Sequence, residues 1–100
     1  IADGGSFTLI SGILNTKPIP FAIADATTSG AIDTFVKCVA LEMPRNTRIN
    51  VINPTVLTEA WDVYGEMMPG FEPVPSQLVG KAFERSVDGF ITGEVIFVDA

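Results

Sequence analysis

The sequence predicts an α/β fold in which helices cover both faces of a parallel sheet. Three short apolar segments, residues 6–11, 48–53 and 94–98, have the composition of strands. Two segments between them, residues 24–43 and 76–87, carry apolar side chains at helical spacing. Because strands that are separated by helices run parallel, this order predicts three parallel strands with right-handed crossovers.

Composition and charge exclude several classes of protein. The 100 residues are enough for one small domain or for part of a larger one. The net charge of −6, with six basic residues that form no cluster, argues against a nucleic-acid partner. No apolar run has transmembrane length, so no membrane partner is expected. The chain has no histidine, the commonest metal ligand, and we expect no metal site.

The first strand and the loop after it are predicted from their different compositions. Residues 6–11 (SFTLIS) are mostly apolar and follow Gly4 and Gly5, which predicts a strand buried on both faces. Residues 12–20 contain two prolines and an asparagine, which predicts a loop.

Residues 24–43 are predicted to form one long helix that is apolar on two sides. Asp25, Thr27 and Thr28 are candidate N-terminal caps. Cys38, the only cysteine, lies on the apolar stripe and is expected to be a small buried side chain in a reducing compartment such as the cytoplasm. A helix with two apolar sides packs on a sheet and also meets another surface. The stripe and its extension comprise Ala31, Ile32, Phe35, Val36, Val39, Ala40, Leu41 and Met43.

The second strand ends at Asn53-Pro54, because proline cannot donate to a strand ladder. Residues 55–75 form a long segment that is rich in proline and aromatic side chains, and segments of this kind are often lids over a site. Its large side chains either line a substrate pocket or simply pack on the domain; they are Trp61, Tyr64, Met67, Met68 and Phe71.

The second helix is predicted to begin at Ser76 as its cap and to end at Gly89. Ligands in parallel sheets bind beyond the carboxyl ends of the strands. Those ends are predicted at Ser11-Gly12, at residues 53–55 and at Asp99.

Four segments resemble the short-chain dehydrogenase/reductase family, in the family's order and spacing. Residues 5–12 (GSFTLISG) resemble its fifth strand, and residues 28–42 its active-site helix, which usually ends in Leu-Ala-x-Glu. Residues 48–54 (RINVINP) are similar to the sixth strand and its corner, and residues 91–99 (ITGEVIFVD) to the closing strand. The resemblance implies a Rossmann-type, three-layer αβα sheet, of which this chain is the C-terminal half. It also implies an oxidoreductase that uses NAD(P) on a small carbonyl or alcohol substrate.

The family's catalytic Ser, Tyr and Lys are replaced at the matching positions. Gly12, Asp25 and Ser29 stand there, and Ser11 lies one residue from the serine position. Two interpretations remain for Asp25: a carboxylate base, with Ser11 donating to a carbonyl, or a residue that only begins the helix. Loss of general acid–base help typically costs about 10²–10⁴ in rate.

The resemblance places the nicotinamide corner after the second strand. There the family has Pro-Gly-x-Val-x-Thr, whereas this chain has Thr55 for the glycine and Glu59 for the final threonine. The glycine-rich phosphate turn does not occur in the sequence. We therefore expect residues 1–100 to be a single partial domain preceded by roughly 100 residues. The candidate cofactor contacts are Pro54, Thr55, Val56, Leu57 and Thr58.

Two functions follow from the resemblance. One is an NAD(P)-dependent oxidoreductase; the alternative is a family member that has lost catalysis and acts as a binding or oligomeric scaffold. An unrelated acidic interaction module is the third hypothesis, and the four ordered segments argue against it. Family usage also implies a homodimer or homotetramer formed through residues 31–43.

Overall fold

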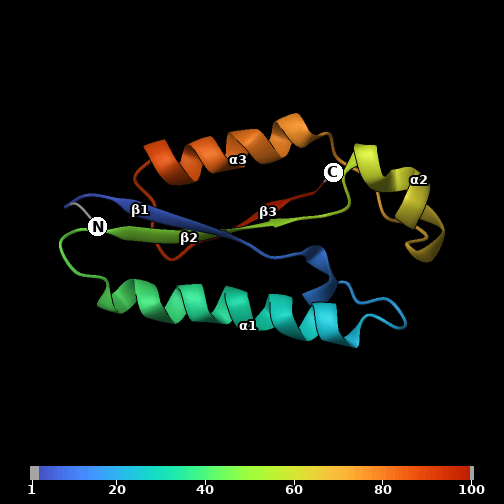
Figure 1. Cartoon of the computed structure of the whole chain (residues 1–100), viewed down its shortest axis with the longest axis horizontal. Helices are drawn as coiled ribbons and strands as arrows, with labels where there is room; N and C mark the ends of the chain where they lie inside the picture. Colours follow the sequence, from blue (N-terminus) through green and yellow to red (C-terminus); the bar gives the residue numbers. More distant parts are fainter. Residues whose placement is uncertain (1–2, 100) are drawn as a thin grey trace.

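The computed structural model describes residues 3–99 and has three parallel strands at its centre (Figure 1). Strands β1 (Ser6–Ile10), β2 (Arg48–Pro54) and β3 (Val95–Val98) pair in the order β1-β2-β3. Both pairings are parallel. The predicted α/β class, strand order and strand direction are therefore confirmed.

Helices cover the two faces of this sheet, which gives three layers. Helix α1 (Ile23–Val39) lies on one face and α3 (Ser76–Asp88) on the other (Figure 1). The long segment after β2 is not a plain loop. It contains the 3-10 turns Thr58–Ala60 and Gly65–Met67 on either side of the short helix α2 (Trp61–Tyr64). These turns gather at the end of the sheet toward which the strands run.

The central strand β2 supplies side chains to a core on each side. Val51 is fully buried and packs with Val36 of α1, whereas Ile52 is fully buried and packs with Ala82 of α3. Successive side chains of a strand point to opposite faces, so the adjacent Val51 and Ile52 each serve one helix.

Strand β1 differs from its prediction because it lies at the edge of the sheet. Phe7 is 46% exposed and Ile10 is 53% exposed, so the strand is not buried on both faces. Apolar composition alone does not show whether a strand lies at the centre or at the edge of a sheet. The side chains of an edge strand can stay partly uncovered, as those of Phe7 and Ile10 do.

Several details of α1 also correct the sequence analysis. The α-helix ends at Val39 and continues as a 3-10 turn over Ala40–Glu42, instead of running to residue 43. Its N-cap is Ala22, with no side-chain cap, so the predicted capping residues only lie in the first turns. Cys38 is exposed, because it lies on the side of the helix that faces away from the sheet.

Residues from other parts of the chain form hydrogen bonds with both ends of α3. Ser76 does not cap the helix, whose N-cap is Pro75; its hydroxyl donates to Glu59 at 2.6 Å. At the other end, the Arg48 guanidinium donates to the carbonyls of Ser86 at 2.6 Å and Val87 at 2.7 Å. It also reaches the carbonyl of Ile91 at 3.2 Å. The first residue of β2 thus satisfies carbonyl groups that the helix end leaves free.

Candidate functional site

A cavity of about 750 Å³ lies at the carboxyl ends of β1 and β2. Its walls come from the end of β1, the loop before α1, the corner after β2 and the turns around α2. This is the place where ligands bind in parallel sheets. The lining residues from the first two of these parts are Ser11, Gly12, Ile13, Leu14, Ile19, Pro20, Phe21, Ala22 and Asp25. Those from the last two are Pro54, Thr55, Val56, Leu57, Ala60, Tyr64, Glu66, Met67, Met68 and Pro69.

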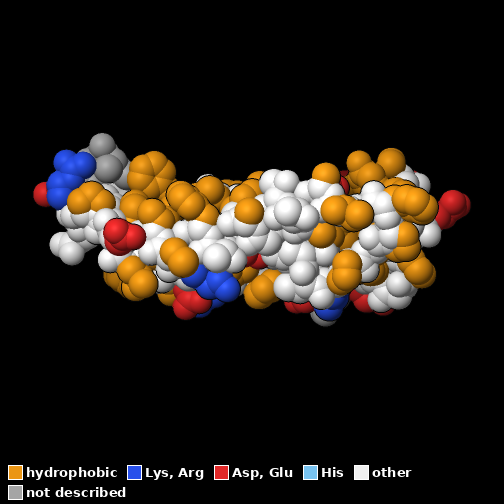
Figure 2. Space-filling view, turned by 90° about the horizontal axis from the view of Figure 1, so that it is seen from below, with side chains coloured by type: hydrophobic (Ala, Val, Ile, Leu, Met, Phe, Trp, Pro, Cys, Tyr) orange, Lys and Arg blue, Asp and Glu red, His pale blue; other side chains and the backbone are white. Residues whose placement is uncertain are grey.

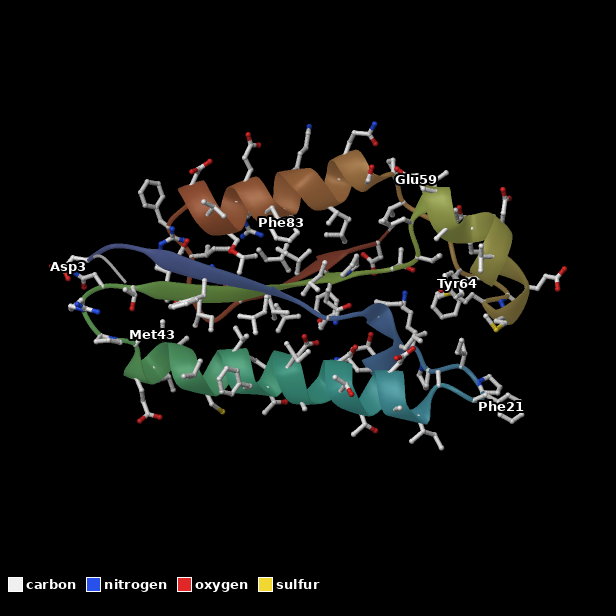
Figure 3. The ribbon with its side chains drawn as sticks, in the orientation of Figure 1. Asp3, Phe21, Met43, Glu59, Tyr64 and Phe83 are labelled. Carbon is white, nitrogen blue, oxygen red and sulfur yellow. The ribbon has the colours of Figure 1, made fainter. Side chains whose placement is uncertain are left out.

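A backbone bridge folds the segment after β2 over this cavity. The Val74 N–H donates to the Val56 carbonyl at 3.0 Å, and the Thr58 N–H donates to the Val74 carbonyl at 2.8 Å. Val74 is almost completely buried, so this bridge anchors the segment to the core. Tyr64 therefore lies beside the strand ends, while Phe21 lies at the tip of the loop before α1 (Figure 3).

The structure brings the catalytic candidates together. Ser11, Gly12 and Asp25 all line the cavity. Ser29 does not line it, but its Oγ would lie 3.5 Å from a Cβ added at Gly12. Three of the four positions from the resemblance therefore line the cavity, and the fourth lies next to one of them.

The substrate candidates divide into two groups. Tyr64, Met67 and Met68 line the cavity. Trp61 does not; its indole packs so closely on Gly65 that a Cβ there would lie 2.9 Å from the ring. Phe71 lines a second hollow of about 260 Å³ next to Asp99, so the end of β3 does not reach the main cavity as expected.

One backbone N–H of the corner after β2 has no backbone partner among residues 3–99. Pro54, Thr55, Val56 and Leu57 line it, whereas Thr58 does not. Within residues 3–99 the Leu57 N–H bonds no other backbone group, while its carbonyl accepts the Ala60 N–H at 2.9 Å. The Leu57 N–H is therefore a candidate donor for a ligand at this corner.

The charges of the lining do not fit phosphate groups. Its charged residues are Asp25 and Glu66, and no lysine or arginine joins them among residues 3–99. Glu59, beyond the corner, turns away to accept the hydroxyl of Ser76, and this hydrogen bond lowers the Glu59 pKa below its ordinary value. A dinucleotide would need other residues to hold its phosphates.

Sequence analysis missed a buried polar cluster beside the cavity. Asp33 of α1 is only 6% exposed and accepts three hydrogen bonds. The donors are Ser11 Oγ at 2.6 Å, Asn15 Nδ2 at 2.7 Å and Asn53 Nδ2 at 2.8 Å. A signal was present: Asp33 is a charged residue that directly follows Ile32 of the apolar stripe, where a carboxylate needs polar partners.

Metal-binding clusters and membrane-spanning helices are both absent from residues 3–99. Among residues 3–99, no group of three or more histidine, cysteine, aspartate or glutamate side chains is arranged to hold a metal ion. In the same part of the chain, no helix has the length and hydropathy needed to cross a membrane.

Comparisons with known proteins identify the fold. No protein-family model matches the chain. No curated protein matches it. Among solved structures it is similar to the protein lin1944 from Listeria innocua, with 46% identity and a TM-score of 0.95, over 97% of this chain and 48% of that one.

Two further solved structures carry a description of their type. A small-chain dehydrogenase in complex with NADPH is 26% identical, with a TM-score of 0.82, over 99% of this chain and 51% of that one. A short-chain dehydrogenase/reductase family protein is 19% identical, with a TM-score of 0.80, over 95% and 44%. The chain spans about half the length of these structures. The resemblance found in the sequence is thus confirmed, and the chain has the Rossmann-like fold of the short-chain dehydrogenases/reductases.

Proposed function

We propose that the protein is a short-chain dehydrogenase/reductase-like oxidoreductase that uses NAD(P) on a small alcohol or carbonyl compound. One observation carries the proposal. A single cavity at the strand ends contains both the positions expected for catalysis, Ser11, Gly12 and Asp25, and the corner expected to bind nicotinamide, Pro54 to Leu57.

The residues of the corner would bind the nicotinamide end of the cofactor. When bound, NAD(P) supplies the hydride chemistry of the reaction. The free Leu57 N–H would donate to the carboxamide, and Val56 and Met68 would give the ring apolar neighbours. The acidic lining does not suit the phosphates, so it favours contact with the nicotinamide end alone. That a similar solved structure is a complex with NADPH supports the choice of cofactor.

The replacements at the catalytic positions lower the rate of turnover that we expect. Gly12 and Ser29 carry no group that titrates near neutral pH, and Asp25 is exposed at the start of α1. General acid–base help of the kind a tyrosine gives is therefore weak, and we expect turnover about 10²–10⁴ slower than with a full set of groups. Binding of the cofactor without any turnover would favour the scaffold alternative.

We further propose that the chain works as the second half of a larger domain in the cytoplasm. The match to about half of each similar structure supports this, as does the exposed apolar edge at Phe7 and Ile10. We base the choice of the cytoplasm on Cys38, because the sequence has no second cysteine with which it could form a disulfide.

The outward face of α1 is the proposed contact of a homodimer or homotetramer. Phe35 is 55% exposed and Leu41 in the following turn is 88% exposed. Figure 2, seen from the α1 side, shows hydrophobic side chains along this face. Light scattering of the wild type should give a dimer or tetramer, and Phe35→Glu should dissociate it. A monomeric wild type would contradict the proposal.

The function is tested by titrating the full-length protein with NADPH and with NADH, and then by screening alcohols and carbonyl compounds for turnover.

A sharper test of the cofactor contact uses Leu57→Pro. This substitution removes the Leu57 N–H, and the Leu57 φ of −78° already suits proline. The affinity should fall about tenfold, as expected for one lost hydrogen bond. Leu57→Val keeps the N–H and should bind normally. Absence of nucleotide binding in the wild type would refute the proposed cofactor.

A further inference from the structure

The cluster around Asp33 determines whether the Ser11 hydroxyl can donate a hydrogen bond to a ligand or only accept one. A carboxylate only accepts hydrogen bonds, so the 2.6 Å contact commits the one hydroxyl hydrogen of Ser11 to Asp33 Oδ1. The other oxygen, Oδ2, accepts both asparagine amides, from Asn15 and Asn53. Asp33 has no ion-pair partner within the described part of the chain, so these three donors alone compensate its burial.

Ser11 lines the cavity, and with its hydrogen committed to Asp33 its hydroxyl can only accept from a ligand. Its oxygen retains lone pairs, but its hydrogen points to Asp33. This differs from one of the two interpretations of the sequence, in which Asp25 is a base and Ser11 donates to a carbonyl. A ketone placed at Ser11 would bring two acceptors together, whereas an alcohol would donate to Ser11 Oγ.

The charged groups of the lining are acceptors as well, while the Thr55 and Tyr64 hydroxyls and the Leu57 N–H can donate at other points of the wall. Those charged groups, Asp25 and Glu66, are carboxylates, and most other lining side chains are apolar. We propose that the cavity binds an apolar alcohol in preference to the ketone of the same shape, and that Asp33 is the positioning residue that sets this preference. The inference rests on the proposed function in one respect: it names the better-bound member of the alcohol–carbonyl pair.

The test needs no cofactor. Binding of cyclohexanol and of cyclohexanone to the full-length protein is measured by ligand-observed NMR titration. We expect cyclohexanol to bind about five- to tenfold more tightly, the ratio that one hydrogen bond gives. Equal affinities, or tighter binding of the ketone, would overturn the proposal.

The substitution Asp33→Asn reverses the hydrogen bond without changing the shape of the side chain. Its amide oxygen still accepts from Asn15 and Asn53, while its amide nitrogen donates to Ser11 Oγ and frees the hydroxyl hydrogen for the cavity. The preference should move to cyclohexanone, and Ser11→Ala should remove the preference in both directions. Retained side-chain amide signals of Asn15 and Asn53 would show that the cluster is intact. An unchanged ratio in an intact Asp33→Asn protein would exclude Asp33 as the positioning residue.

The two hypotheses fail separately. A protein that prefers cyclohexanol but binds neither NADPH nor NADH keeps this inference and loses the proposed function. A protein that binds nucleotide without discriminating between the two probes keeps the proposed function and loses this inference.

Discussion

The contact between Arg48 and the end of α3 gives the most direct test of how the fold is held together. Arg48→Met keeps much of the aliphatic stem and removes the guanidinium, which donates to three carbonyls. A hydrogen bond from a charged group contributes about 1.5–3 kcal/mol. The three bonds share one side chain and the longest, to Ile91, is 3.2 Å, so their energies do not simply add. We expect the free energy of unfolding to fall by about 3 kcal/mol.

Urea denaturation followed by circular dichroism measures this change. Arg45→Met is the matched control, because Arg45 forms only a 3.7 Å pair with Asp3 in which both side chains are more than half exposed. An exposed pair of this kind contributes less than about 1 kcal/mol. If Arg48→Met costs no more than Arg45→Met, the guanidinium does not stabilise the end of the helix, and the reasoning is refuted.

Three further predictions concern the core, the glycines and one carboxylate. Ile52→Ala should lower the free energy of unfolding by about 2–5 kcal/mol and Ile52→Val by about 0.5–1.5, because the side chain is fully buried; equal costs in urea titrations would contradict this. Gly93→Ala should destabilise, since its φ is +73° and an added Cβ meets a side chain at 3.1 Å. Gly80→Ala, in open space on α3, should stabilise by up to about 1 kcal/mol, and thermal melts giving the same sign for both would refute the comparison. The pKa of Glu59, lowered in the fold by the Ser76 hydroxyl, should rise toward 4.5 in Ser76→Ala, as NMR titration would show. Since the folded pKa is the lower one, this contribution to stability is complete above pH 4.5 and is lost as the pH falls through the folded value; an unshifted pKa would contradict it.

The sequence by itself determined the class of fold and the order of its elements. Ile49, Val51 and Ile52 predict a core strand over residues 48–53, and the helical stripe around Val36 predicts a helix that packs on the sheet; both predictions agree with the burial of Val36 and Val51. Once helices separate the strands, the parallel direction follows from chain connectivity. The place of the cavity then follows as well, because parallel strands bring their carboxyl ends to one edge.

Only the tertiary structure decided which polar groups meet at that edge. Asp33 receives bonds from residues that precede it by 22 and 18 positions and follow it by 20. Periodicity within a segment carries no information about such pairs, since they depend on how far α1 slides along the sheet and on the β1–β2 register. The prediction that Cys38 is buried was wrong for a related reason: a helix that is apolar on two sides does not show which side faces the sheet. The pattern of residues within a segment predicts which side chains share one face of a helix or strand. The direction of the Ser11 hydroxyl depends instead on Asp33, a carboxylate that tertiary packing brings from another element.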